Sequence, residues 1–360
     1  MISSRRRFSL GMDRYSGLYL WALFIVVFGV WKTGLFLSQA TLHSVASSQS
    51  IVAILAIAVL IPMAAGAYDL SVGATINFSA IVAAVLQTNK HWDMWAAIAV
   101  AVVCGIAIGV VNGFIVVKLR VNSFIATLGM ATIVTAVQEI VSGQAQPLPP
   151  TSNSWNQLTQ YTVFGFQIVV LYLVVLALLA WWVLDFTPAG RYIRATGSNP
   201  EAARLAGVNV SKWTWLSLIA SGGICGVGGV LFASLNGPSL TFGAGLLLPA
   251  FAAVFLGSTQ FQPGRVNLWG TLVSVYVLAT GVEGLQLVTG VQWLSDMFNG
   301  CALIGAVSFA VWRQKAASRR PRELTRPAEP DSEDGDAKRP TAVDASPALP
   351  AAKMRLQGRR

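Results

Sequence analysis

Long apolar runs separated by short polar or charged segments dominate the chain. A helix needs about 20 apolar residues to cross a bilayer, and two of the longest runs are interrupted by polar stretches, at 38–50 and at 236–239. With both runs divided, the pattern predicts about ten spans. Their expected bounds are 17–37, 47–66, 73–89, 94–117, 122–141, 166–185, 213–235, 246–259, 266–288 and 291–312.

The composition agrees with this reading. Apolar residues make up 54% of the chain and charged residues only 11%, whereas soluble domains carry about 25% charged residues. We therefore predict an all-α integral membrane protein with a basic N-terminal segment at 1–16 and a transmembrane domain at 17–312. The tail at 313–360 is rich in Pro, Ala and charge, a composition typical of disorder.

The net charge of +10 is distributed along the chain in a way that predicts its topology. With ten spans, 23 of the 25 basic residues fall on one side of the membrane, and only Lys32 and Lys90 fall near the other. Cytoplasmic segments are enriched in Lys and Arg, so we expect both termini and the tail in the cytosol. No aromatic residues interleave the basic groups of the tail, and a nucleic-acid partner is therefore not expected.

One polar segment, 190–208, is the best-defined connector between two apolar runs. Ser198 and Asn199 can cap a short helix, Pro200 suits its first turn, and Glu201 would complete a capping box. We expect Ala203 on the contact face of this helix. The segment is either a solvated cytosolic connector or a docking helix for another subunit. In the second case, the residues of this chain that contact the subunit would be Ser198, Asn199, Pro200, Glu201, Ala202, Ala203, Arg204, Leu205, Ala206 and Gly207.

Several motifs resemble the permeases of ATP-binding-cassette (ABC) sugar importers, the ribose and xylose permease family. The resemblance covers roughly residues 17–312 and rests on Gly190-Arg191-Tyr192, on the segment from Gly197 to Val208, on Asp69-Leu70-Ser71-Val72-Gly73, on Phe124-Ile125-Ala126-Thr127-Leu128-Gly129 and on Ala252-Ala253-Val254-x-Leu256-Gly257.

This resemblance implies a permease of a bacterial inner membrane that works with three partners. They are an ATP-binding cassette subunit that docks on 190–208, an extracytoplasmic sugar-binding protein, and a second permease copy. The outer loop at 143–165 is either a platform for a partner or a passive linker. The resemblance also implies two inverted four-helix repeats, for which the sequence gives faint support: five of fourteen positions from Gly73 are identical to those from Gly243.

Four polar residues are candidates for the substrate path. Asp69 can cap a broken helix or act as a gate near the cytosolic mouth. Asn112 can bond to a neighbouring helix or line the path. Glu283, with Gln286 on the same helical face, lies inside a span, where an ionisable side chain indicates function by default. Glu283 can line the sugar path or bond to a neighbouring helix.

Catalytic machinery and metal ligands are not expected. The chain has no phosphate-binding Gly-x-x-x-x-Gly-Lys-Ser/Thr loop and its two histidines are isolated, so ATP would be used by the partner and no cofactor is predicted. Ribose permeases carry Glu-Leu-Asp where this chain has Leu247-Leu248-Pro249, so the resemblance does not fix the sugar. The alternatives are a permease for another small polar solute, such as an amino acid, and an ion-coupled secondary carrier.

Overall fold

The computed structural model of the chain describes residues 12–262 and 264–318, and most of the predicted N-terminal segment and tail lies outside these ranges. Six described helices are long and apolar enough to cross a membrane, and three shorter ones are also apolar. With α14 they form a set of ten, as many as the predicted spans: α1 (Met12–Trp31), α3 (Gln39–Ala64), α4 (Val72–Thr88), α5 (Met94–Val117), α6 (Ser123–Ser142), α8 (Ile168–Phe186), α11 (Val210–Asn236), α12 (Phe242–Gly257), α13 (Leu268–Thr289) and α14 (Trp293–Ser318).

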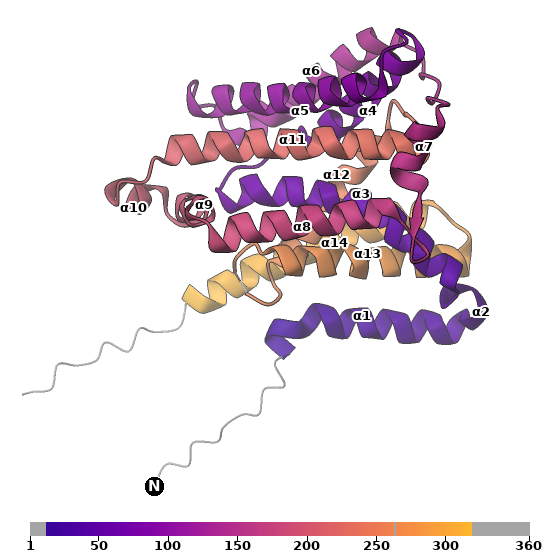
Figure 1. Cartoon of the computed structure of the whole chain (residues 1–360). Helices are drawn as coiled ribbons and strands as arrows, with labels where there is room; N and C mark the ends of the chain where they lie inside the picture. Colours follow the sequence, from indigo (N-terminus) through magenta and orange to yellow (C-terminus); the bar gives the residue numbers. More distant parts are fainter. Residues whose placement is uncertain (1–11, 263, 319–360) are drawn as a thin grey trace, which may run out of the picture. The chain divides into compact units, whose positions relative to one another are not determined.

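Short elements join the long helices at both ends of the bundle. A four-residue helix, α2 (Thr33–Phe36), follows α1, and α9 (Pro188–Ser198) and α10 (Pro200–Leu205) join α8 to α11. The connection from α6 to α8 holds α7 (Asn153–Gln160) and a small antiparallel hairpin of β1 (Thr162–Val163) and β2 (Phe166–Gln167). Figure 1 shows α9 and α10 at one end of the bundle and α7 at the other.

The predicted bounds of the first two spans are wrong. The first helix ends at Trp31 rather than at residue 37, and the second long helix begins at Gln39 rather than at 47. Ser38 caps α3 by accepting a hydrogen bond from the Thr41 N–H at 3.2 Å. Inside α3, the Ser47 hydroxyl donates to the His43 carbonyl at 2.9 Å. Serine hydroxyls that bond to the preceding turn are compatible with a helix, so the polar stretch does not interrupt it.

The long helices form two inverted repeats, α3–α6 and α11–α14. The helices of the second repeat begin 171, 170, 174 and 170 residues after their counterparts in the first. Equivalent pairs also make equivalent contacts: α3 packs on α13 as α11 packs on α5, and α4 packs on α6 as α12 packs on α14. Corresponding helices run in opposite directions between the two ends of the bundle in Figure 1. This arrangement is typical of transporters with repeats of inverted topology.

The two repeats meet where the first turns of α4 and α12 cross at a pair of glycines. A Cβ atom added to Gly73 would lie 2.6 Å from the Gly243 carbonyl oxygen, and one added to Gly243 would lie 1.9 Å from the Gly73 carbonyl oxygen. Only glycine allows such a close approach of two backbones. The identities around Gly73 and Gly243 therefore mark the contact between the repeats.

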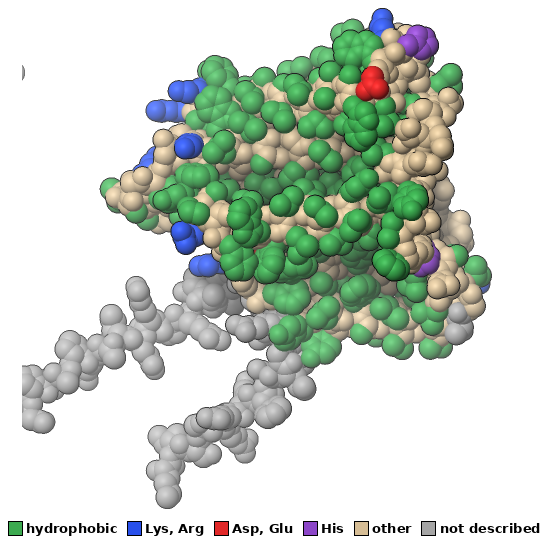
Figure 2. Space-filling model, viewed as in Figure 1, with side chains coloured by type: hydrophobic (Ala, Val, Ile, Leu, Met, Phe, Trp, Pro, Cys, Tyr) green, Lys and Arg blue, Asp and Glu red, His purple; other side chains and the backbone are tan. Residues whose placement is uncertain are grey.

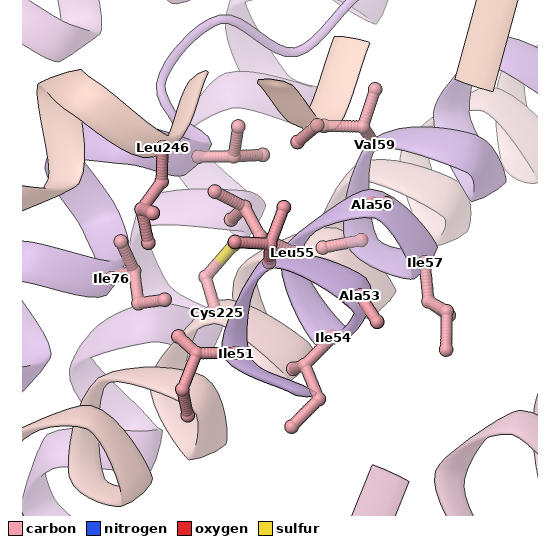
Figure 3. Packing of buried hydrophobic residues seen from close by; sticks show 14 of the residues in the cluster. Ile51, Ala53, Ile54, Leu55, Ala56, Ile57, Val59, Ile76, Cys225 and Leu246 are labelled. Atoms are coloured by element: carbon pink, nitrogen blue, oxygen red, sulfur yellow. The ribbon is translucent and has the colours of Figure 1, made fainter. Parts of the chain in front are cut away.

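The core of the protein is built around α3. Ten consecutive residues of this helix, Ile51 to Leu60, are at most 7% exposed, and a helix that is apolar all round is a buried one. Figure 3 shows Ile51 and Leu55 of α3 close to Cys225 of α11, with Ile76 and Leu246 nearby. Helix α3 thus packs against helices of its own repeat and of the other repeat.

The end of the bundle that carries α9 and α10 is also its basic end. Lys118 and Arg120 follow α5 on this side, Arg191 and Arg194 lie in α9, and Arg265 precedes α13. Figure 2 shows Lys and Arg side chains gathered around this end, while broad hydrophobic surface covers the sides of the helices. Such a surface is expected of a protein surrounded by lipid.

Candidate docking and transport sites

The predicted docking segment forms two helices rather than one. In α9, Gly190 packs so closely that a Cβ atom would lie 2.0 Å from the Leu184 carbonyl oxygen, and Gly197 meets the Ala64 carbonyl at the end of α3 in the same way. An ion pair between Arg194 and Asp185 joins α9 to the end of α8. The segment is therefore held firmly against the membrane-spanning helices.

The second helix, α10, has a well-formed cap at each end. The Asn199 side chain accepts a hydrogen bond from the Ala202 N–H at 3.0 Å. Gly207, with a φ of +81°, ends the segment in the left-handed conformation that glycine adopts readily. The expected capping box is wrong, because Ser198 is the last residue of α9 and Asn199 alone is the cap of α10.

The exposed face of α10 differs from the expected contact face. Ala203 is only 5% exposed and faces the protein, whereas Leu205 is 91% exposed. The expectation for Ala203 is therefore wrong: a six-residue helix is short enough for α9 and α11 to cover the Ala203 side. Ala202, Leu205 and Ala206 are exposed and form the surface that α10 presents at the basic end of the bundle.

Asp69 lies in a buried polar cluster between α3 and α4. The carboxylate is 1% exposed and accepts hydrogen bonds from the Ser71 N–H at 3.0 Å, the Ser71 hydroxyl at 2.6 Å and the Ser221 hydroxyl at 2.8 Å. Asn112 is fully buried and donates to the Ser71 hydroxyl at 2.8 Å. These contacts join the segment before α4 to α5 and α11. A gating role for Asp69, or a place on the path for Asn112, stays a prediction.

Glu283 and Gln286 lie on α13 in a different part of the molecule. Glu283 lines a cavity of about 300 Å³, which is otherwise almost entirely apolar and is bordered by α1, α2, α3 and the hairpin. It makes no hydrogen bond or ion pair with the residues that the structure describes. Gln286 donates to the Ser295 hydroxyl at 2.6 Å and so joins α13 to α14. The structure thus separates Glu283 from the cluster at Asp69, and its place in the sugar path stays a prediction.

A second polar cluster, which the sequence analysis missed, holds the repeats together near Gly243. The Asn77 side chain donates to Gln138 Oε1 at 2.8 Å and to the Leu240 carbonyl at 2.6 Å, and accepts from the Gly243 N–H at 3.3 Å. Gln138 is 1% exposed. An Asn and a Gln 61 residues apart give no local signal of such a bond.

The exposed surface of α6 includes polar side chains in the middle of the helix. On α8 the exposed residues before Asp185 are all apolar. On α6, Thr132, Thr135 and Glu139 are exposed at helical spacing on one side, beside apolar residues such as Ile133 and Ile140. An ionisable side chain in a membrane helix faces protein or water rather than lipid. This face of α6 was not singled out from the sequence.

Comparisons with known proteins agree with this architecture. A permease family described as the branched-chain amino acid transport system permease component matches residues 41–307. The fructose import permease FrcC of Rhizobium meliloti is 30% identical over 84% of this chain and 86% of its own length. No solved structure matches the chain.

Two further relatives extend the range of solutes. The autoinducer 2 import permease LsrC of Salmonella typhi is 31% identical over 76% of this chain and 79% of its own length. The ribose import permease RbsC of Escherichia coli K12 is 31% identical over 79% of this chain and 90% of its own length. Because the family match and these relatives each cover most of the chain, this protein belongs to the permease family of ABC importers, whose members are transport subunits and not enzymes.

Proposed function

We propose that this chain is the membrane-spanning subunit of an ATP-driven importer for a neutral monosaccharide. The relatives named for fructose and ribose support the solute class. The observation that carries the proposal is α10, a capped helix held at the basic end of the bundle with Leu205 91% exposed. A large apolar side chain so exposed beyond the membrane-spanning helices suits a protein partner.

The partner at α10 is an ATP-binding cassette subunit, because this chain has no phosphate-binding loop of its own. On ATP binding, two cassette subunits would approach each other and carry the docking segments with them. Since α9 packs on α3 and α8, movement of the segment is transmitted to the helix bundle. Rigid-body rocking of the repeats would then switch access from one side of the membrane to the other.

A second copy of the chain completes the path in this proposal. The face of α6 with Thr132, Thr135 and Glu139 would lie against the central path rather than against lipid. An extracytoplasmic binding protein would deliver the sugar to the end of the bundle opposite α10. That end carries α7 and the hairpin.

The docking role is tested with Leu205→Asp, measured in proteoliposomes that contain the permease, its cassette subunit and its binding protein. An aspartate on the exposed face places an unpaired charge in the interface, which costs about 2 kcal/mol or more. We expect the cassette subunit to bind at least tenfold more weakly and uptake to fall accordingly, with normal membrane insertion.

Leu119→Asp is the matched control, because Leu119 is also exposed on the basic side but lies outside 190–208. Normal cassette binding and uptake in Leu205→Asp would refute the docking role.

The family's description favours a second candidate, a branched-chain amino acid as solute. Competition between labelled fructose or ribose and unlabelled leucine in the same proteoliposomes separates the two. An ion-coupled carrier is distinguished by a third result: uptake by the permease alone that stops when the ion gradient is collapsed.

A further inference from the structure

Two symmetry-equivalent contacts between the repeats, α5 on α11 and α13 on α3, differ in how closely the helices pack. In the contact of α5 with α11, a Cβ atom on Gly105 would lie 2.4 Å from the Gly222 carbonyl oxygen, and one on Gly109 would lie 2.5 Å from the Leu218 carbonyl oxygen. The two glycines therefore let α5 lie directly on α11, the closest kind of helix contact. No room remains for a solute between them.

The symmetry-equivalent contact, between α13 of the second repeat and α3 of the first, has larger residues at these positions. At the spacing of 174 residues between α5 and α13, Gly105 corresponds to Ala279 and Gly109 to Glu283. Ala279, together with Val275, lines a cavity of about 160 Å³ among α3, α12, α13 and α14. The cavity thus results from a specific departure from the symmetry of the repeats.

Two amide side chains line this cavity without partners. Neither the Gln49 side chain of α3 nor the Asn299 side chain of α14 makes a hydrogen bond to a described residue. The symmetry-related positions, at the spacings of 171 and 170 residues, are Ala220 of α11 and Gly129 of α6, so neither amide has a counterpart in the other repeat. Pro249 of α12 also lines the cavity, and a proline inside a helix leaves the carbonyl four residues earlier without its helical partner.

The chemistry of the lining selects a neutral solute with several hydroxyl groups. An amide both donates and accepts hydrogen bonds, as a hydroxyl does. None of the nine lining residues is charged, which disfavours a zwitterion such as an amino acid. A cavity of about 150 Å³ holds a six-membered ring, so this one has the volume for a single small ring.

The depth of the cavity places it within the membrane. Gln49 lies ten residues after the start of α3, and Asn299 six residues after the start of α14. At 1.5 Å per residue, the amides are about 9–15 Å from the ends of these helices opposite α10. A solute entering from the side of α7 would meet them before the middle of the bundle.

We propose that the cavity between Gln49 and Asn299 binds the sugar ring in transit and sets the sugar preference of the importer. This inference rests on the proposed function and assigns its solute contacts to the cavity where α3 meets α12, α13 and α14 in each permease copy. The apolar residues of the cavity contact the ring faces, and the amides bond to ring hydroxyls.

The first experiment measures maximal uptake rates of labelled fructose and ribose by the complete importer. Asn299→Leu and Gln49→Leu each remove the hydrogen bonds of one amide, and the expected effect is a three- to tenfold change in uptake or in the ratio between the sugars. Ala279→Leu, which fills the cavity and removes no polar group, should slow uptake as well. Gln292→Leu is the matched control, because Gln292 is exposed outside the cavity.

The second experiment is independent of turnover. Asn299→Cys, in a permease whose three native cysteines are replaced by Ala, is labelled with a small thiol reagent without ATP. Fructose or ribose at high concentration should slow labelling at least threefold, and leucine should not. Gly129→Cys, at the equivalent position of the first repeat, should show no protection.

The outcomes separate this inference from the proposed function. If the wild-type importer takes up neither sugar, the proposed function fails. If it takes up sugar while the amide variants transport normally and Asn299→Cys is not protected, the cavity is not a sugar site and the proposed function stands.

Discussion

Asp69 shows how one buried carboxylate can join three helices of a membrane protein. It accepts three hydrogen bonds from Ser71 and Ser221, and Asn112 extends the cluster to α5. Inside a bundle the donors have no water to bond to, so losing their acceptor costs more than the bond itself contributes. The cluster therefore fixes the turn between α3 and α4 whatever else Asp69 does.

We expect Asp69→Ala to lower the free energy of unfolding by about 3 kcal/mol or more, because a hydrogen bond to a charged group contributes about 1.5–3 kcal/mol. Asp69→Asn keeps an acceptor and should be milder. Thermal unfolding in detergent measures both variants, with Ser48→Ala, an exposed serine of α3, as the control. Equal unfolding temperatures for Asp69→Ala and the control would contradict the structural role of the cluster.

At the scale of the elements, hydropathy predicted the helices better than it predicted their faces. The bounds of α5 are those expected from the sequence, since Asp93 and Lys118 sharply delimit its apolar run. The helix of the docking segment was also expected, but its exposed side was not. In a six-residue helix the position of Ala203 depends on α9 and α11, whose packing is not encoded in the segment itself.

The contact between α5 and α11 gives a prediction about packing. Gly105→Ala should destabilise the fold by about 1–3 kcal/mol, because the new Cβ atom forces two backbones apart. Gly305→Ala is the control, since a Cβ atom there meets nothing within 4 Å. Lower thermal stability and weaker assembly of Gly105→Ala alone would support the contact, and equal stability of the two variants would contradict it.

At the scale of the whole molecule, the inverted repeats explain both what the sequence predicts and what it leaves out. Five identities around Gly73 and Gly243 were enough to suggest the repeat, because a backbone crossing demands glycine from both halves. The cavity at Gln49 and Asn299 could not be predicted. It depends on how far α13 lies from α3, and its amides are 250 residues apart with no local pattern to connect them.

The orientation of the bundle in the membrane gives the last prediction. The described ends of α1 and α14 lie on the same side as α9 and α10 in Figure 1, and basic residues gather there. Because basic segments stay in the cytosol, a phosphatase that is active only outside the cytosol should be inactive when fused after Ala317. It should be active when inserted at Pro150, in the connection between α6 and α7. A chain truncated after Ala317 keeps all of α9 and α10 and should transport at the full-length rate. An active phosphatase after Ala317 would place the docking segment on the outer side, where no cassette subunit could reach Leu205.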